Sequence, residues 1–212
     1  GDVGTTIYKI NESNWTSWQG WHDEIGQDWK GMSHDDLSEL LSDIAELRLQ
    51  ESEKQNVYKL SYYVDEHVDR NALLEEVQKR LDGQGLETSL IWSVDEQAHV
   101  GLLDILPERA TKEHAVRFLM KNKGFSEEGT VYAGDSGNDL APLTSGLQAV
   151  LVKNAAEDVR REALKAVQEK GYPEKLYLAR GGFRGMNGNY SAGVLEGLAY
   201  FIPEARRWME RA

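Results

Sequence analysis

The sequence predicts an α/β protein with a parallel sheet and a second, smaller α/β domain. Two patterns carry this prediction. After Pro107, helix-like and strand-like segments alternate, as they do when parallel strands are joined by helical crossovers. Before Pro107 the order is helix, strand, helix, strand, strand, which suits a small sheet with helices on one face. The 212 residues are 40% hydrophobic and 28% charged, so the chain can build one large domain or two small ones.

The first half opens with residues 1–8, which indicate a strand end and a turn. A tryptophan-rich segment follows, and its near-helical spacing favours core packing over stacking on a sugar. Its members are Trp15, Trp18, Trp21 and Trp29. Leucine and isoleucine then recur at helical spacing and predict a helix over 34–50 that starts at Ser33. The remaining predicted elements are a strand over 56–64, a helix over 70–81 ending at Gly83, and strands over 89–94 and 100–106.

The second half predicts three short strands separated by helices. In chain order these elements are a helix from Thr111, strands over 131–133 and 149–152, a helix over 155–167, a strand over 176–178 and a helix over 191–201. Such alternation implies parallel strands with right-handed crossovers.

Composition excludes several classes of function. A net charge of −12 argues against nucleic acid as a partner, because backbone binding needs clustered Lys and Arg. The absence of cysteine removes disulfides, thiolate catalysis and Cys-ligated metals, and it fits a cytoplasmic location. The apolar runs are strand-sized and no signal pattern opens the chain, so neither a membrane span nor a membrane partner is expected.

The most specific chemical signal is the run Gly134 to Leu140, Gly-Asp-Ser-Gly-Asn-Asp-Leu, directly after an apolar strand. Ligands bind at the carboxyl ends of parallel strands. Two carboxylates and an amide on a tight turn there can hold a hard divalent cation, while the backbone N–H groups face an anion.

Other interpretations of this run can be compared directly. A calcium EF-hand loop from Asp135 needs Gly sixth and Glu twelfth, and those places hold Leu140 and Gly146. A serine-hydrolase elbow needs Gly-x-Ser-x-Gly, whereas Gly137 directly follows Ser136. A purely structural role, in which Asp and Asn shape the turn and cap the next helix, stays open.

Residues 133–140 resemble the fourth motif of the haloacid dehalogenase (HAD) superfamily, in the form typical of its sugar-phosphate phosphatases. Residues 106–112, Leu-Pro-Glu-Arg-Ala-Thr-Lys, resemble the third motif. Further stretches are similar to segments of the sucrose-phosphate phosphatases: residues 3–8 to the strand end before the inserted cap, 56–62 to a cap strand, 152–155 to the segment after the next core strand, and 192–198 to the closing helix. The resemblance spans nearly the whole chain in the family's order and implies a Rossmann-like HAD core with an inserted α/β cap.

The resemblance implies roles for five residues. Lys112 would offset charge on the transferring phosphoryl group, Asp135 would bind Mg²⁺, and Asp139 would support either the metal or Lys112. Ser136 and Asn138 would make polar contacts around the phosphate or the metal. These roles fit phosphoryl transfer, in which positioning and charge stabilisation dominate catalysis.

In the family, the nucleophile and the general acid/base are two aspartates of a D-x-D motif on the first strand, and a Ser or Thr on the next strand binds phosphate. The 212 residues, which begin at Gly1, contain neither feature. We therefore expect the phosphatase core to comprise residues 1–9 and 104–212, with the first strand and its D-x-D motif missing, and the cap to comprise residues 10–103. The 212 residues alone are expected to be inactive.

Three cap residues, Lys59, Ser61 and Tyr62, are candidates for contact with the sugar, Lys59 foremost. Solvent-facing strand positions explain them equally well. The basic run 180–185 predicts a loop rather than a phosphate cradle, because no Walker or dinucleotide pattern is present. The five histidines show no metal-ligand spacing.

The expected function is Mg²⁺-dependent hydrolysis of a sugar phosphate, sucrose 6-phosphate or a glycosyl phosphate such as mannosylfructose phosphate, through an aspartyl-phosphate formed on an upstream Asp. The partner is then a small molecule, and the protein is expected to be a monomer or weak oligomer. The alternative is a non-catalytic phosphatase-like module of a synthase that binds sugar phosphate. The intact set Lys112, Asp135, Asn138 and Asp139 favours the enzyme.

Overall fold

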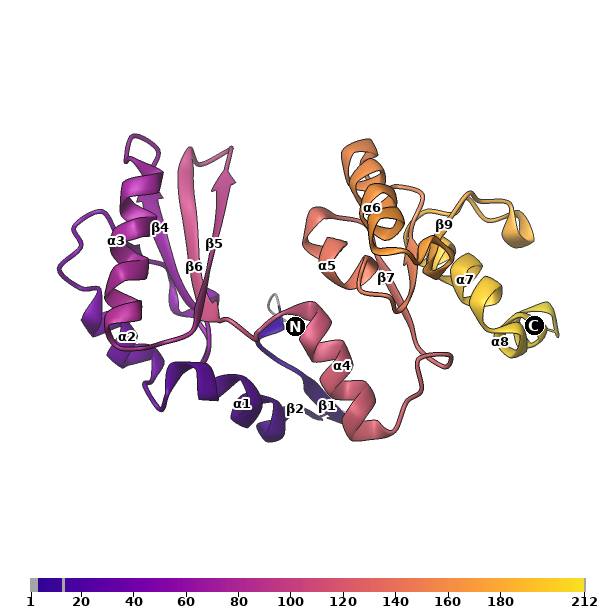
Figure 1. The fold of residues 1–212 in the computed structure, drawn as a ribbon, viewed down its shortest axis with the longest axis horizontal. Coiled ribbons are helices and arrows are strands. Elements are labelled where there is room, and N and C mark those ends of the chain that lie inside the picture. Colours follow the sequence, from indigo (N-terminus) through magenta and orange to yellow (C-terminus); the bar gives the residue numbers. More distant parts are fainter. Residues whose placement is uncertain (1–3, 13, 212) are drawn as a thin grey trace. The chain divides into compact units, whose positions relative to one another are not determined.

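The computed structural model describes residues 4–12 and 14–211 (Figure 1). The chain divides into two compact units, with the boundary along the sequence between Thr111 and Lys112. The first unit is built around an antiparallel sheet and the second around a parallel one. The structure thus confirms the α/β fold class and the parallel sheet of the second half.

The first unit contains a four-stranded sheet of order β3-β4-β6-β5 and a separate hairpin, β1-β2. Its elements are β1 (Tyr8–Asn11), β2 (Asn14–Ser17), α1 (Gln19–Ile25), η2 (Gly26–Trp29), α2 (His34–Leu40), β3 (Arg48–Leu49), η3 (Ser52–Lys54), β4 (Leu60–Asp65), α3 (Arg70–Gly83), β5 (Thr88–Asp95) and β6 (Val100–Pro107).

Helices α2 and α3 cover one face of this sheet (Figure 1). Alternation along the strands decides which side chains they bury. In the central pair, Tyr62 of β4 lies opposite Leu103 of β6 in register, and both belong to the core under the helices. The neighbouring register pair, Ser61 and Asp104, therefore lies on the other face of the sheet.

The helix predicted over 34–50 ends at Leu40. Its start is as expected, since Ser33 accepts from the Asp36 N–H in a capping box. Beyond Leu40 the chain continues in short turns, in which the Ile44 N–H bonds the Leu41 carbonyl and the Leu47 N–H bonds the Ile44 carbonyl. Such turns repeat apolar residues every three positions, so they reproduce the spacing of a helix.

Residues 4–7 are held by partners from the first unit. The Trp21 indole donates to the Gly4 carbonyl at 3.0 Å, and the Asn56 amide donates to the Thr5 hydroxyl at 2.9 Å.

Of the four tryptophans, Trp21 and Trp29 are buried as expected, whereas Trp15 is 67% exposed. The division into a core of residues 1–9 and 104–212 and a cap of residues 10–103 stays a prediction.

The second unit contains a three-stranded parallel sheet of order β7-β8-β9. Its elements are α4 (Lys112–Lys123), β7 (Val131–Gly134), η4 (Gly137–Asp139), α5 (Leu140–Leu143), β8 (Gln148–Leu151), α6 (Glu157–Lys170), η5 (Pro173–Lys175), β9 (Leu176–Leu178), η6 (Phe183–Gly185), α7 (Tyr190–Phe201) and α8 (Pro203–Arg211).

Strand β8 is buried on both faces, as a central parallel strand should be. Ala149 and Leu151 pack in a cluster with α6, and Val150 packs on the opposite face in a cluster that includes Phe201 of α7. Helix α7 approaches closely because it carries glycine at the contact: a Cβ at Gly197 would collide with the side chain of Val150. This packing fixes the carboxyl ends of β7 and β8 side by side.

Candidate active site

Asp139 is the centre of the polar cluster at the end of β7. Its carboxylate is buried, and one oxygen, Oδ1, accepts from the Lys112 ammonium at 2.7 Å and from the Tyr132 hydroxyl at 2.7 Å. The other oxygen, Oδ2, accepts from the Asp135 and Ser136 N–H groups at 3.2 Å each and from the Ser136 hydroxyl at 3.0 Å. Asp139 therefore joins the loop, the strand and the first residue of α4.

These bonds keep Asp139 ionised. Burial raises its pKa, but the Lys112 ammonium, the Tyr132 hydroxyl and the Asp135 N–H together outweigh burial and hold the pKa at about 2. Burial and the adjacent carboxylate in turn raise the pKa of Tyr132, so its phenol stays protonated as a donor. Lys112 thus lies beside a fixed negative charge, with a third of its side chain still exposed (34%).

The loop takes this shape because Gly134 leaves room for it. A Cβ at Gly134 would lie 2.5 Å from Cβ and 2.6 Å from Cγ of Asp139. Any other residue there would displace the carboxylate that the loop folds around. Asp139 therefore does shape the turn, as the structural interpretation expected, and it also binds Lys112.

Asp135 is exposed at the carboxyl end of β7. One of its oxygens, Oδ2, accepts from the Asn154 amide at 3.3 Å, and the hydrogen bonds found among the described residues leave Oδ1 open. This carboxylate is a suitable ligand for Mg²⁺, which prefers oxygen. No three His, Cys, Asp or Glu side chains come together as a metal site within the described residues, so Asp135 would supply only one ligand of an oxygen shell.

The other two predicted loop residues differ in their surroundings. Ser136 directs its hydroxyl to Asp139. Asn138 is exposed on the short 3₁₀ turn η4 and is not part of the hydrogen-bonded cluster around Asp139. The structure thus brings Lys112, Asp135, Ser136 and Asp139 together, with Asn138 on the adjoining turn.

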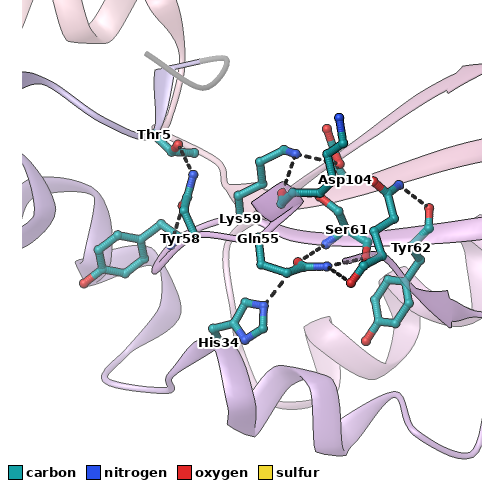
Figure 2. Close-up of polar contacts among 11 residues, drawn as sticks. Thr5, His34, Gln55, Tyr58, Lys59, Ser61, Tyr62 and Asp104 are labelled. Atoms are coloured by element: carbon teal, nitrogen blue, oxygen red, sulfur yellow. Dashed lines mark hydrogen bonds and ion pairs between the residues drawn. The ribbon is translucent and has the colours of Figure 1, made fainter. Parts of the chain in front are cut away.

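The cap candidates lie on two faces of their sheet (Figure 2). Ser61 is fully buried and donates to Asp104 Oδ1 at 2.5 Å, and the Lys59 ammonium lies 3.4 Å from the same oxygen. Lys59 also donates to the Lys54 carbonyl at 2.9 Å. Tyr62 is 4% exposed in the core beneath the helices, so it lies apart from Lys59 and Ser61.

Sequence reasoning missed three partners of the predicted residues: Tyr132, Asp104 and Asn154. Tyr132 looked like an apolar strand residue, although a tyrosine two positions before Gly134 lies on the same face of the strand as that glycine. Asp104 interrupts an apolar strand, which was a usable signal of a buried polar contact. Asn154 gave no signal beyond its place after β8.

The fold is that of the haloacid dehalogenase-like hydrolases. The sucrose-phosphatase of Synechocystis sp. PCC6803, solved in complex with sucrose and phosphate, superposes with a TM-score of 0.60 at 24% identity, covering 94% of this chain and 71% of that one. A haloacid dehalogenase-like hydrolase of Bacillus subtilis superposes with a TM-score of 0.59 at 19% identity, covering 95% and 67%.

The chain belongs to the family described as Sucrose-6F-phosphate phosphohydrolase, which matches residues 1–202. A HAD-like hydrolase of Nitrosococcus oceani is 58% identical over 99% of this chain and 56% of its own length. Sucrose-phosphatase 1 of Nicotiana tabacum is 28% identical over 86% of this chain and 39% of its own. Mannosylfructose-phosphate phosphatase of Agrobacterium fabrum is 26% identical over 75% and 60%. The chain thus spans about half the length of these curated relatives.

Within the part of the chain that the structure describes, every helix is too short or too polar to cross a bilayer.

Proposed function

We propose that the full-length protein is a Mg²⁺-dependent phosphatase acting on a sugar phosphate. The observation that carries this proposal is the cluster at the end of β7. There the Lys112 ammonium lies 2.7 Å from the Asp139 carboxylate, and the same carboxylate accepts from the backbone N–H of Asp135, whose own side chain is exposed. A fixed cation and a metal-binding carboxylate at one strand end are what a dianionic phosphate ester requires. Without them, the net charge of −12 would repel such a substrate.

Each residue of the cluster has a distinct task in this account. Lys112 neutralises charge on the phosphoryl oxygens, and Asp139 holds the ammonium in place and braces the loop through two backbone N–H groups. Asp135 would hold Mg²⁺, and Ser136 and Asn138 line the turn around it. Bound Mg²⁺ supplies charge stabilisation for the phosphoryl group and orients it.

The nucleophile is proposed to lie on a segment that precedes Gly1. Its carboxylate would attack phosphorus and the bond from phosphorus to the sugar oxygen would break, with a second aspartate giving its proton to the departing oxygen. Water would then hydrolyse the aspartyl-phosphate, releasing inorganic phosphate and regenerating the carboxylate.

The edge of β7 supports this arrangement. Among the described residues, β7 is an edge strand that pairs only with β8. It ends at Gly134, beside the Asp139 cluster. An unpaired edge of a parallel sheet presents N–H and C=O groups that a further strand can bond. A strand added there would end next to Asp135, the place where a nucleophile and further metal ligands are needed.

Sucrose 6-phosphate or a related glycosyl phosphate, such as mannosylfructose phosphate, is the proposed substrate. The names of the relatives support this class, and Lys59 supports it physically because its ammonium lies on the sheet face away from the helices, beside Asp104. An ammonium and a carboxylate side by side can bond the hydroxyls of a sugar. We further propose that the protein acts in the cytoplasm as a monomer or weak oligomer.

The test is phosphate release by the full-length protein from a panel of sugar phosphates, in Mg²⁺ and in chelator. Mg²⁺-dependent release from a sucrose or mannosylfructose phosphate is expected, with Asp135→Asn inactive and Asp158→Asn, an exposed aspartate of α6, unaffected. A folded full-length protein that binds these compounds without releasing phosphate would instead be a binding module.

A further inference from the structure

Asn154 lies where three segments of the second unit meet. It follows β8, its amide nitrogen donates to Asp135 Oδ2 at 3.3 Å, and its amide oxygen accepts from the backbone N–H of Tyr190 at 2.7 Å. Tyr190 is the first residue of α7. One side chain therefore connects the loop after β7 to the start of the last long helix on the sheet.

The direction of the Asn154 amide is fixed by its partners. A backbone N–H can only donate, so the amide oxygen must face Tyr190, and the NH₂ group must then face Asp135. Asp135 thus receives a hydrogen bond on one oxygen while its other oxygen stays open. This bond favours the orientation of the carboxylate in which Oδ1 is the open oxygen.

The backbone at Tyr190 gives independent evidence that this junction is held firmly. Tyr190 has φ of +46°, a left-handed conformation that a bulky side chain adopts only when surrounding contacts impose it. The bond from its N–H to Asn154 is one such contact. A second is the bond from the Lys153 N–H to the Gly188 carbonyl at 3.0 Å, which fixes the loop before α7 to the chain beside Asn154.

The junction also borders an open pocket that contains Asp135. The residues that line this pocket are Ala133, Gly134, Asp135, Val152, Tyr190 and Val194. Asp135 is the sole carboxylate among these lining residues. The pocket wall is otherwise backbone, aliphatic side chains and the Tyr190 ring, so the orientation of Asp135 decides how a cation is bound there.

We propose that Asn154 is a positioning residue that orients Asp135 for a divalent cation, an inference that rests on the proposed function. In this role Asn154 would contact Asp135 and not the phosphoryl group or the ion. It acts through the hydrogen bond from its NH₂ group to Asp135, and the bond from the Tyr190 N–H to its amide oxygen fixes the orientation of that NH₂ group. Groups of this kind set how well a metal ligand works, and their loss lowers metal affinity by about 10- to 100-fold.

The experiment measures Mn²⁺ binding to the full-length protein by electron paramagnetic resonance, with the shift in thermal unfolding caused by Mg²⁺ as a second readout. Asn154→Ala removes the donor and should weaken Mn²⁺ binding about tenfold or more. Asn154→Asp keeps an acceptor for the Tyr190 N–H but places a second carboxylate against Asp135. It should therefore bind Mn²⁺ more tightly than the parent and show a larger Mg²⁺-induced shift. Asn122→Ala, on the outer side of α4, is the matched control and should leave both readouts unchanged.

The two Asn154 variants are expected to change Mn²⁺ affinity in opposite directions. This difference separates a positioning role from a general contribution to the stability of the fold. If both variants bind Mn²⁺ like the parent, or if both lose affinity together with metal-free thermal stability, the positioning role is wrong. A parent protein that binds no Mn²⁺ would count against the proposed metal-dependent function itself, and the inference would fall with it.

Discussion

Replacing Asp139 with asparagine tests the central contact of the site. The carboxylate accepts five hydrogen bonds, two on Oδ1 and three on Oδ2. An asparagine amide has one acceptor oxygen, so its NH₂ group would face either the Lys112 ammonium or the two backbone N–H groups. Whichever way it turns, at least two donors lose their partner.

The magnitude follows from the donors left without a partner. Each such buried donor costs about 1 to 3 kcal/mol, and at least two donors lose their partner. The pKa of about 2 in place of 3.8 is a second measure of the same contacts and corresponds to about 2 kcal/mol of preference for the ionised form. We therefore expect Asp139→Asn to lower the free energy of unfolding of the second unit by about 2 to 5 kcal/mol.

Tryptophan fluorescence is a poor probe here, because five of the six tryptophans lie in the first unit and Trp208 is 69% exposed. Hydrogen exchange of the β8 amides, measured by mass spectrometry in increasing urea, reports on the second unit directly. Glu162→Gln makes the same chemical change on the exposed side of α6 and should stay within about 0.5 kcal/mol of the parent. A loss below about 1 kcal/mol in Asp139→Asn would refute the reasoning.

Three further predictions address other parts of the chain. Gly134→Ala should reduce phosphate release by at least about tenfold, because the new Cβ would lie 2.5 Å from Asp139; activity equal to the parent would contradict this. Lys59→Met should raise KM for the sugar phosphate more than it lowers kcat, whereas the exposed control Lys54→Met should change neither; equal effects would remove Lys59 from the sugar site. Burial raises the pKa of Glu196, but two backbone N–H groups and a tyrosine hydroxyl outweigh burial and bring the pKa below the ordinary 4.5. The ionised carboxylate therefore stabilises the fold above about pH 4.5. That contribution is lost as the pH falls through the lower folded-state pKa. Urea unfolding should therefore show a smaller loss of stability on acidification in Glu196→Gln than in the parent, and parallel losses would contradict this assignment.

The elements of the second unit could be predicted from the sequence because local and global signals agree there. Short apolar runs give β7, β8 and β9, and the polar run at Gly134 ends the first of them. The prediction of a helix over 34–50 was wrong beyond Leu40, and the reason is physical. Consecutive three-residue turns place Leu41, Ile44 and Leu47 toward the core, as a helix would. The β1-β2 hairpin and α8 were not anticipated.

Within the site, the residues that carry charge could be predicted, but their hydrogen-bond partners could not. Lys112 and Asp139 are 27 positions apart, and nothing in the spacing alone says that they meet at 2.7 Å. The direction of Tyr132 and the link from Asn154 to Tyr190 depend on how β7, β8 and α7 pack together. Side-chain partners across elements follow from the tertiary structure, which local periodicity does not encode.

The most direct test of the central claim is phosphate release by the full-length protein carrying Lys112→Met, measured beside Lys165→Met on the exposed side of α6. If the ammonium at the end of β7 stabilises the transferring phosphoryl group, Lys112→Met should lower kcat by about 100-fold or more while Lys165→Met matches the parent. A Lys112→Met protein that stays folded and releases phosphate at the parent rate would contradict the claim that this cluster is the phosphoryl-transfer site.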